Sequence, residues 1–276
     1  MTSLNMNMKR TQLKILIKLS GVLLLNAVLP LVAQAQESIY QRFSPIDITG
    51  NWVAVITEDW HVRMITPAPG YLAGLPLSNR GRESANAFDI EQFRESGQAC
   101  QAYGAPVLLR EPGRLQISWQ DGDTLRIDMD SGEQSRFLHF DNPPQPGAPS
   151  LQGLSLAEWQ YAGGFDPQRQ LLNPDQGTGR RTLNQRTPAQ QMVGGKLYVE
   201  TGNLSAGLLR KNGVPYSSET EVKEYFNTLT EADGTEWLIV TTIVRDPVNL
   251  LVEYITSSNF RREADNAGWD PRPCTL

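Results

Sequence analysis

Arg114–Phe140 reads RLQISWQDGDTLRIDMDSGEQSRFLHF, and this stretch decides the fold. Apolar side chains stand at every second position on both sides of Asp121-Gly122, which is the period of a strand buried on one face. Asp121-Gly122 is a hairpin dipeptide, and Asp130-Ser131-Gly132 is a second tight turn. We therefore predict an antiparallel meander of three strands, over Arg114–Trp119, Thr124–Met129 and Gln134–Phe140.

Outward from the meander, the chain indicates more short strands and one surface helix, over Ser78–Phe93 with Ser78 as its N-cap. The four prolines of Asp141–Ser150 predict a loop. Gly163–Gly195 is rich in Gln and Gly, and we predict a flexible insertion there. Thr220–Leu229 fits a strand or a short helix, and we favour the strand. The other predicted strands are Ile46–Ile56, Leu154–Tyr161, Lys196–Thr201, Trp237–Val244 and Leu251–Phe260.

Eight or more short strands, one modest helix and no alternation of strands with helices are typical of an all-β protein. We predict a single antiparallel barrel or a closed sandwich, because such a fold leaves few exposed strand edges.

The N-terminus has the pattern of a signal peptide. Four basic residues, Lys9, Arg10, Lys14 and Lys18, precede the apolar run Leu19–Val32, and Ala33-Gln34-Ala35 supplies a small-x-small cleavage pattern. The run is shorter than the about 20 apolar residues of a membrane span. We predict a signal peptide over residues 1–35, one domain over residues 36–276, and a periplasmic or secreted protein.

The charge balance narrows the class of partner. The chain has 25 basic and 30 acidic residues, and four of the basic ones lie in the predicted signal peptide. The mature chain would therefore carry 21 basic and 30 acidic residues, a formal charge of −9. An acidic chain is not expected to coat nucleic acid or an anionic membrane. After the signal peptide, no apolar stretch reaches the length of a transmembrane span.

Cys100 and Cys274 are the only cysteines. In an oxidising compartment an even pair usually forms a disulfide, and we predict one here. The alternative is two unrelated buried thiols. Two cysteines and two histidines without close spacing offer no chelating cluster, so no metal site is predicted. Phosphate-cradling and dinucleotide-binding glycine motifs are also absent, and no cofactor is predicted.

Candidate catalytic residues lie just after the first strand, in Glu58-Asp59-Trp60-His61-Val62-Arg63. A carboxylate beside an imidazole can poise a general acid or base, so Asp59 and His61 are the catalytic candidates. The alternative is a solvated strand end with an ion pair between Asp59 and Arg63.

Charged residues of the meander have two interpretations. Arg126, Asp128, Asp130 and Arg136 fit cross-strand pairing on the solvent face. The alternative is a polar barrel interior that binds a ligand, since parity does not say which face is inside. Candidate ligand-binding residues are Arg63, Trp52, Tyr216 and Arg210, the last two flanking an Asn-Gly-Val-Pro turn.

A series of short motifs resembles an uncharacterised family of exported bacterial proteins. The resemblance covers nearly all of the mature chain except the Gln/Gly-rich insertion, and it implies no established activity or catalytic residue. The motifs are Gly50-Asn51-Trp52, Glu58-Asp59-Trp60 with Arg63, Leu75-Pro76-Leu77, Gly81-Arg82, Cys100 with Tyr103-Gly104-Ala105-Pro106, LLRKNGVPY over Leu208–Tyr216, TTIVRDP over Thr241–Pro247, and WDPRPC over Trp269–Cys274.

Gly50-Asn51-Trp52 on a first strand also resembles the opening of lipocalin-like barrels. That resemblance implies that Trp52 closes the floor of the barrel and that a small, largely apolar ligand fills the cup.

Three functions remain as hypotheses. The first is an exported protein that binds a small hydrophobic or amphipathic molecule. The second is a metal-free acid–base enzyme, a hydratase, isomerase or lyase acting on a lipid-like or terpenoid substrate. In it Asp59 and His61 would transfer protons, and Arg63 or Tyr216 would hold an oxyanion. The third is a structural or interaction module of the cell envelope.

Overall fold

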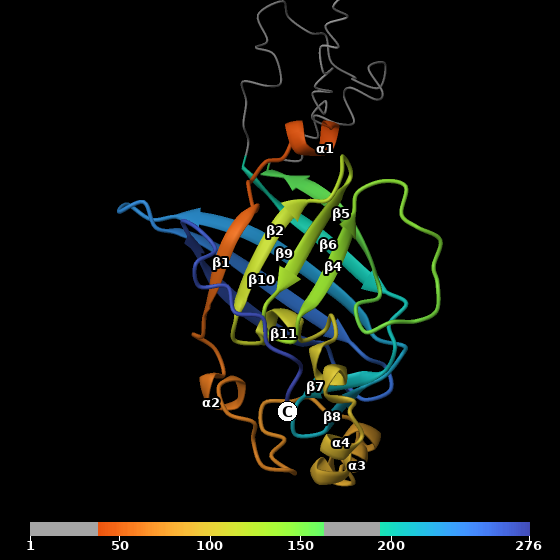
Figure 1. The fold of residues 1–276 in the computed structure, drawn as a ribbon. Coiled ribbons are helices and arrows are strands. Elements are labelled where there is room, and N and C mark those ends of the chain that lie inside the picture. The colour runs from red at the N-terminus through yellow and green to blue at the C-terminus, as the bar shows by residue number, and fades with distance from the viewer. Residues whose placement is uncertain (1–37, 163–193) are drawn as a thin grey trace, which may run out of the picture. The chain divides into compact units, whose positions relative to one another are not determined.

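The computed structural model describes residues 38–162 and 194–276, which contain a closed barrel of nine strands (Figure 1). Around the barrel the strands follow the order β1-β11-β10-β9-β6-β5-β4-β3-β2. Neighbouring strands are antiparallel except β4 and β5, which run parallel over two residue pairs. The strands are β1 (Gly50–Val55), β2 (Arg114–Trp119), β3 (Thr124–Met129), β4 (Gln134–His139), β5 (Leu154–Tyr161), β6 (Gly195–Gly202), β9 (Glu221–Thr230), β10 (Glu236–Arg245) and β11 (Tyr254–Glu263).

The meander has the predicted strands, to within one residue at every end. The alternating apolar side chains of its first two strands face the interior, where Leu115, Ile117, Leu125, Ile127 and Met129 are each at most 2% exposed. The prediction of an all-β barrel is confirmed, with the single parallel pair as the departure from a purely antiparallel one.

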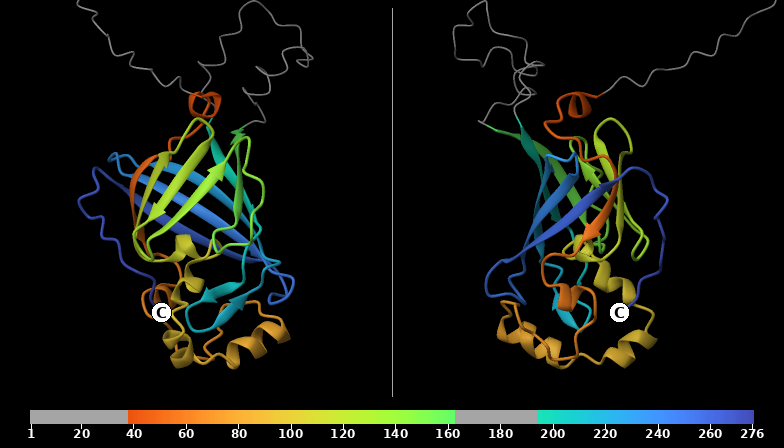
Figure 2. Two further views of the ribbon diagram at one scale, coloured as in Figure 1. Left: turned by 45° about the vertical axis from the view of Figure 1, so that its right-hand side comes forward. Right: turned by 90° about the vertical axis from the view of Figure 1, so that its left-hand side faces the viewer.

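Short elements close the two ends of the barrel (Figure 2). At one end lies α1 (Ile39–Arg42), where the Tyr40 ring packs on Phe140 with the centroids 5.3 Å apart. The opposite end is covered by a larger cap. The cap consists of α2 (Trp60–Arg63), α3 (Asn79–Asn86), α4 (Ile90–Glu95), the 3-10 turns η1 (Ala99–Tyr103) and η2 (Leu108–Arg110), and the hairpin β7 (Gly207–Arg210) and β8 (Val214–Tyr216).

One local expectation changes in the cap, and a second is confirmed. Ser78 does cap a helix, since its hydroxyl accepts from Gly81 N at 3.0 Å. The helix ends at Asn86, however, because Asp89 starts a second one by accepting from the amides of Glu91 and Gln92. The predicted Asn-Gly turn is present, and it joins the two strands of a small hairpin over Gly207–Tyr216.

The predicted insertion lies almost wholly outside the described residues, since only 194 and 195 belong to both. Within the described ranges, no helix is both long and apolar enough to cross a membrane.

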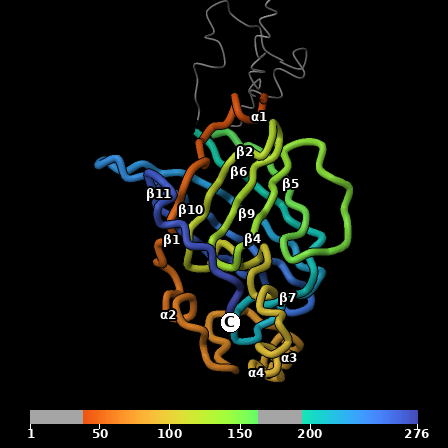
Figure 3. Tube along the Cα trace, in the orientation of Figure 1, coloured from red at the N-terminus to blue at the C-terminus, as the bar shows by residue number. Residues whose placement is uncertain are grey.

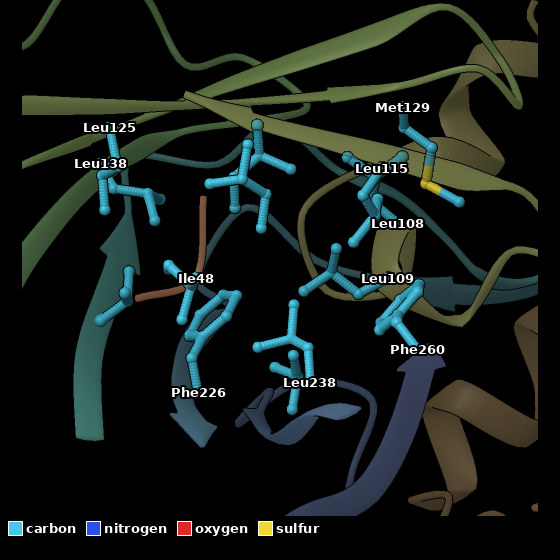
Figure 4. Close-up of a cluster of buried hydrophobic side chains, with 14 of the residues drawn as sticks. Ile48, Leu108, Leu109, Leu115, Leu125, Met129, Leu138, Phe226, Leu238 and Phe260 are labelled. Carbon is cyan, nitrogen blue, oxygen red and sulfur yellow. The ribbon is translucent and has the colours of Figure 1, made fainter. Parts of the chain in front are cut away.

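Side chains from all around the barrel wall meet in its interior (Figure 4). Leu125 and Leu138 lie next to each other in this core, and Phe226 lies near Ile48. Leu108 and Leu109 of η2 enter the same core from the cap and are at most 2% exposed. Apolar burial of this kind contributes roughly 25 cal/mol per Å², so η2 is held firmly in the barrel end.

Arg136 is a correction to the sequence analysis, because it lies inside the barrel rather than on the solvent face. Arg136 of β4 and Glu224 of β9 are fully buried and form a two-armed ion pair, with N···O distances of 3.0 and 2.7 Å. The same guanidinium donates to the hydroxyls of Ser155 and Thr201, on the two strands between. Asp130 is also buried, whereas the expected surface pair exists between Arg126 and Asp128.

Removing one partner of this pair should destabilise the protein strongly. Glu224→Leu leaves the Arg136 charge buried and uncompensated, which typically costs about 3–5 kcal/mol of unfolding free energy. Arg136→Met should cost about as much, and the double variant much less than the sum of the two. Urea unfolding at neutral pH, followed by tryptophan fluorescence, measures all three.

The exposed pair Arg245–Glu221 is the matched control, with an N···O distance of 3.3 Å. The variants Arg245→Met and Glu221→Leu should each change the unfolding free energy by less than about 1 kcal/mol. Equal losses at the two pairs would contradict the role given to Arg136 and Glu224.

Asp246 ties the β10–β11 connection to the cap. Its carboxylate accepts from Ser217 N and Ser217 Oγ, at 2.9 and 2.7 Å, and from Asn249 Nδ2 at 2.8 Å. Burial by itself would raise the pKa of Asp246, but the hydrogen bonds from Ser217, Asn249 and Val248 lower it on balance. The charged carboxylate is therefore part of the folded structure.

Asp246→Asn should lower the unfolding free energy by roughly 1–3 kcal/mol at pH 7, because hydrogen bonds to a charged acceptor are weakened. The pKa of Asp246 is lower in the folded protein than in the unfolded chain, where it is about 3.9. The charged carboxylate therefore stabilises the fold fully at pH values above about 4, and this contribution is lost as the pH falls through the pKa of the folded state. The difference from the wild type should therefore shrink below about pH 4. Denaturation at pH 3 and pH 7 tests this, with Glu231→Gln at an exposed position between β9 and β10 as the control. A difference that is independent of pH would refute it.

Candidate functional site

A cleft of about 720 Å³ opens in the capped end of the barrel. Four separate parts of the chain supply most of its lining, from within residues 62–66, 102–114, 209–211 and 270–276. Figure 3 shows the last of these, the C-terminal segment, reaching the region of α2 and β7. The volume lies within the range of about 300–1,000 Å³ that is usual for small-molecule sites.

The lining of the cleft is positively charged and partly apolar. Six cationic and three acidic side chains line it, although the chain as a whole carries more acidic than basic residues. Clefts lined by one sign of charge concentrate ligands of the opposite sign. The cations are Arg63, Arg110, Arg114, Arg210, Lys211 and Arg272, and apolar surface between them comes from Val62, Met64, Val107, Leu209 and Tyr254.

Arg110 stands directly after the two leucines of η2 and is only 8% exposed. Its guanidinium donates to Asp59 Oδ2 at 2.8 Å and to Glu58 Oε2 at 3.4 Å. Glu58 Oε2 also accepts from the backbone N of Ser257 on β11, at 2.7 Å. Since a buried guanidinium requires a countercharge, these contacts bind the segment after β1 to the floor of the cleft.

Arg63, the last residue of α2, lies beside Arg110. Its Nε donates to the carbonyl oxygen of Arg110 at 2.7 Å, and Nη1 donates to the carbonyl oxygen of Glu58 at 3.4 Å. Nη2 is buried and has no hydrogen-bond partner among the described residues. Burial and the neighbouring Arg110 charge together lower the pKa of Arg63 to about 10. Glu58, Glu111 and Asp59 act in the opposite direction, but burial and Arg110 outweigh them.

Lys211 forms the opposite side of the charged lining. Its Nζ lies 2.6 Å from Glu111 Oε2, donates to the Tyr103 hydroxyl at 2.9 Å, and sits 4.4 Å from the centroid of the Tyr103 ring. Burial by itself would lower the pKa of Lys211, but Glu111 and Tyr103 raise it on balance. Lys211 is therefore charged at neutral pH and is held in place by Glu111.

The C-terminal segment forms one wall, and the disulfide Cys100–Cys274 fixes it. The predicted disulfide is thereby confirmed. Beside the disulfide, Arg272 N donates to Asp130 O at 2.9 Å, and Gly132 N donates to Arg272 O at 2.8 Å. The Tyr103 hydroxyl donates to Thr275 O and accepts from Thr275 N, both at 3.0 Å.

Two of the predicted site residues line the cleft. They are Arg63 and Arg210, and Arg210 donates to the backbone carbonyls of Ala73 and Tyr71 at 3.1 and 3.5 Å. Asp59 lies next to the cleft as the ion-pair partner of Arg110 rather than of Arg63 or His61. Its pairing holds Arg110 in position.

The other predicted residues lie elsewhere. His61 is exposed, with Nε2 3.4 Å from the Tyr71 hydroxyl. Trp52 is fully buried in the barrel wall, where its indole donates to Ile48 O and the Arg262 guanidinium lies 4.2 Å above its ring. Gly50 allows this stacking, since it has a φ of +115° and a Cβ there would lie 2.6 Å from Arg262 Nη1.

Tyr216 is 1% exposed and belongs to the core of the cap, outside the lining of the cleft. Its hydroxyl has no hydrogen-bond partner among the described residues, and burial raises its pKa. The structure therefore does not bring Asp59, His61 and Tyr216 to one cavity, as the acid–base hypothesis requires.

Several residues of the site were not singled out from the sequence. Arg110 and Arg114 stand among ordinary core and turn residues, so only their places at the end of η2 and the start of β2 show their role. Tyr103 and Lys211 occur in two of the motifs quoted above, but no pattern in the sequence assigns a role to either residue. Glycines 104 and 207 of the same region pack against the Tyr216 ring, where a larger residue would clash.

Comparisons of the chain with family models, with curated proteins and with solved structures give no match. Across residues 38–162 and 194–276, no group of three or more His, Cys, Asp or Glu side chains is placed to hold a metal ion. The function must therefore be argued from the cleft itself.

Opening the disulfide should loosen the cleft wall and destabilise the protein. Cys100→Ser with Cys274→Ser removes a cross-link between residues 174 positions apart. Loop closure of that length corresponds to roughly 4–5 kcal/mol in the chain-entropy model. Denaturant unfolding measures the loss of stability.

Hydrogen exchange measures the local effect of the same double variant. The amides of Gly132, Arg272 and Thr275 should exchange faster than in the wild type, while that of Arg42 in α1 should not change under native conditions. Unchanged protection of these three amides would show that hydrogen bonds alone hold the wall.

Proposed function

We propose that this is an exported protein that binds a small amphipathic molecule in the cleft at the capped end of its barrel. The observation that carries the proposal is the cleft itself, with cationic groups and apolar side chains on one surface of about 720 Å³. The disulfide supports export, because such bonds persist in oxidising compartments.

A ligand in this cleft would lie at the capped end of the barrel, which differs from the cup implied by the lipocalin-like resemblance. Side chains from the wall and from η2 pack together in the barrel interior (Figure 4). The cleft is lined by polar as well as apolar groups, so it favours an amphipathic ligand over a wholly apolar one. The dispersed positions of Asp59, His61 and Tyr216 give the acid–base hypothesis less support.

Native mass spectrometry of the protein purified from the cells that produce it tests the proposal. Wild-type protein should carry a noncovalent small-molecule adduct that organic solvent releases. Val62→Trp fills space beside α2 in the cleft and should remove the adduct.

Leu229→Trp is the matched control, because Leu229 is 52% exposed near the end of β9 and is not part of the cleft. This variant should keep the adduct. Adduct-free wild-type protein, or full retention in Val62→Trp, would count against the proposal.

A further inference from the structure

The charges of the cleft differ in how completely they are compensated. Arg110 pairs with Asp59, Lys211 with Glu111, Arg114 with Glu263 and Arg272 with Asp270. Within the part of the chain that the structure describes, no carboxylate forms an ion pair with the other two cations, Arg63 and Arg210.

Arg63 is the more deeply placed of these two. Arg210 holds the loop at residues 71–73 through carbonyl oxygens and reaches solvent. Two nitrogens of the Arg63 guanidinium, Nε and Nη1, donate hydrogen bonds to carbonyl oxygens. The third, Nη2, is buried and has no hydrogen-bond partner among the described residues. The positive charge of Arg110 lies beside this group. A half-buried guanidinium that has no ion-pair partner and lies next to a second cation is unfavourable, and an anion in the cleft would relieve it.

We propose that Arg63, together with neighbouring Arg110 and Lys211, binds the anionic head group of the ligand, a carboxylate or a phosphate. This inference rests on the proposed function, because it names the chemical class of the molecule in the same cleft. A guanidinium suits such groups, since its planar fork matches two oxygens of a carboxylate or phosphate.

The apolar part of the lining determines the rest of the ligand. Val62, Met64, Val107, Leu209 and Tyr254 line the same cleft as the cations. An anionic head and an apolar body on one molecule would satisfy both parts of the surface. The ligand class is thus an amphipathic organic acid, such as an alkyl carboxylate or an alkyl phosphate.

A purely structural role for Arg63 must be distinguished from ligand binding, because Nε and Nη1 also hold η2 and the segment after β1. Matched probes make this distinction. Dodecanoate, dodecyl phosphate and the uncharged dodecanol share one alkyl chain and differ in the head group. A damaged cleft would bind all three less well, whereas loss of an anion contact affects only the two anions.

Isothermal titration calorimetry at neutral pH measures the affinities of delipidated full-length mature protein for these probes. Wild type should bind both anions at least about tenfold more tightly than dodecanol, since a hydrogen bond to a charged group is worth this much. Arg63→Gln should lower the affinity for the anions about tenfold and leave that for dodecanol unchanged. Arg63→Lys should restore part of the loss, because it keeps the charge without the fork.

Arg42→Gln is the control for net charge, because Arg42 is an exposed residue of α1, at the end of the barrel opposite the cap. It should leave all three affinities unchanged. A further test needs no variant, since raising the salt concentration should weaken binding of the anions to wild type and spare dodecanol.

Equal affinities of wild type for dodecanoate and dodecanol would overturn the anion site while leaving a binding cleft in place. Equal loss of all probes in Arg63→Gln would assign Arg63 a structural role and overturn the inference as well. If wild type bound none of the probes, both the anion site and the proposed binding function would fail.

Discussion

The Arg136–Glu224 ion pair is the interaction on which the closed barrel depends most. The barrel is weakest between β4 and β5, where the strands run parallel and pair through only two residue positions. Arg136 on β4 reaches across this seam to Ser155, Thr201 and Glu224, on β5, β6 and β9. Two buried charges are costly to desolvate, so the pair is stable only while its partners remain in register. We therefore infer that the ion pair holds β4 in register with β5, β6 and β9 and so keeps the barrel closed.

Closure of the barrel in turn creates the site. When the strands close into a barrel, the core is still open to solvent at the end of the barrel. Leu108 and Leu109 of η2 cover it there. Arg110, the next residue, is thereby placed at the floor of the cleft with Asp59 as its partner. The disulfide then brings the last residues of the chain against Tyr103. Most of the motif segments quoted from the sequence meet in this cap, although they are spread over more than two hundred residues.

Prediction from the sequence succeeded where one local pattern decides the structure. The strands of the meander were predicted to within one residue, because alternation and turn residues act over short distances. Helix ends were less predictable, and the break before Asp89 arises from a cap that the apolar pattern does not reveal. Arg126 and Arg136 show the limit of parity, since the first lies on the outside and the second inside. Of the candidate site residues, Arg63 and Arg210 line the cleft, while His61, Trp52 and Tyr216 do not.

The sequence by itself therefore determined the elements of this protein: a β-rich chain, the meander, and a cysteine pair suited to a disulfide. The strands and turns follow from interactions between residues close together in the chain. The disulfide follows from the presence of only two cysteines. Only the tertiary structure decided which charges are buried, where the cleft lies and which of its cations lacks a partner. Those properties depend on how distant segments pack, because the charge balance around a side chain is set by its neighbours in space rather than in sequence.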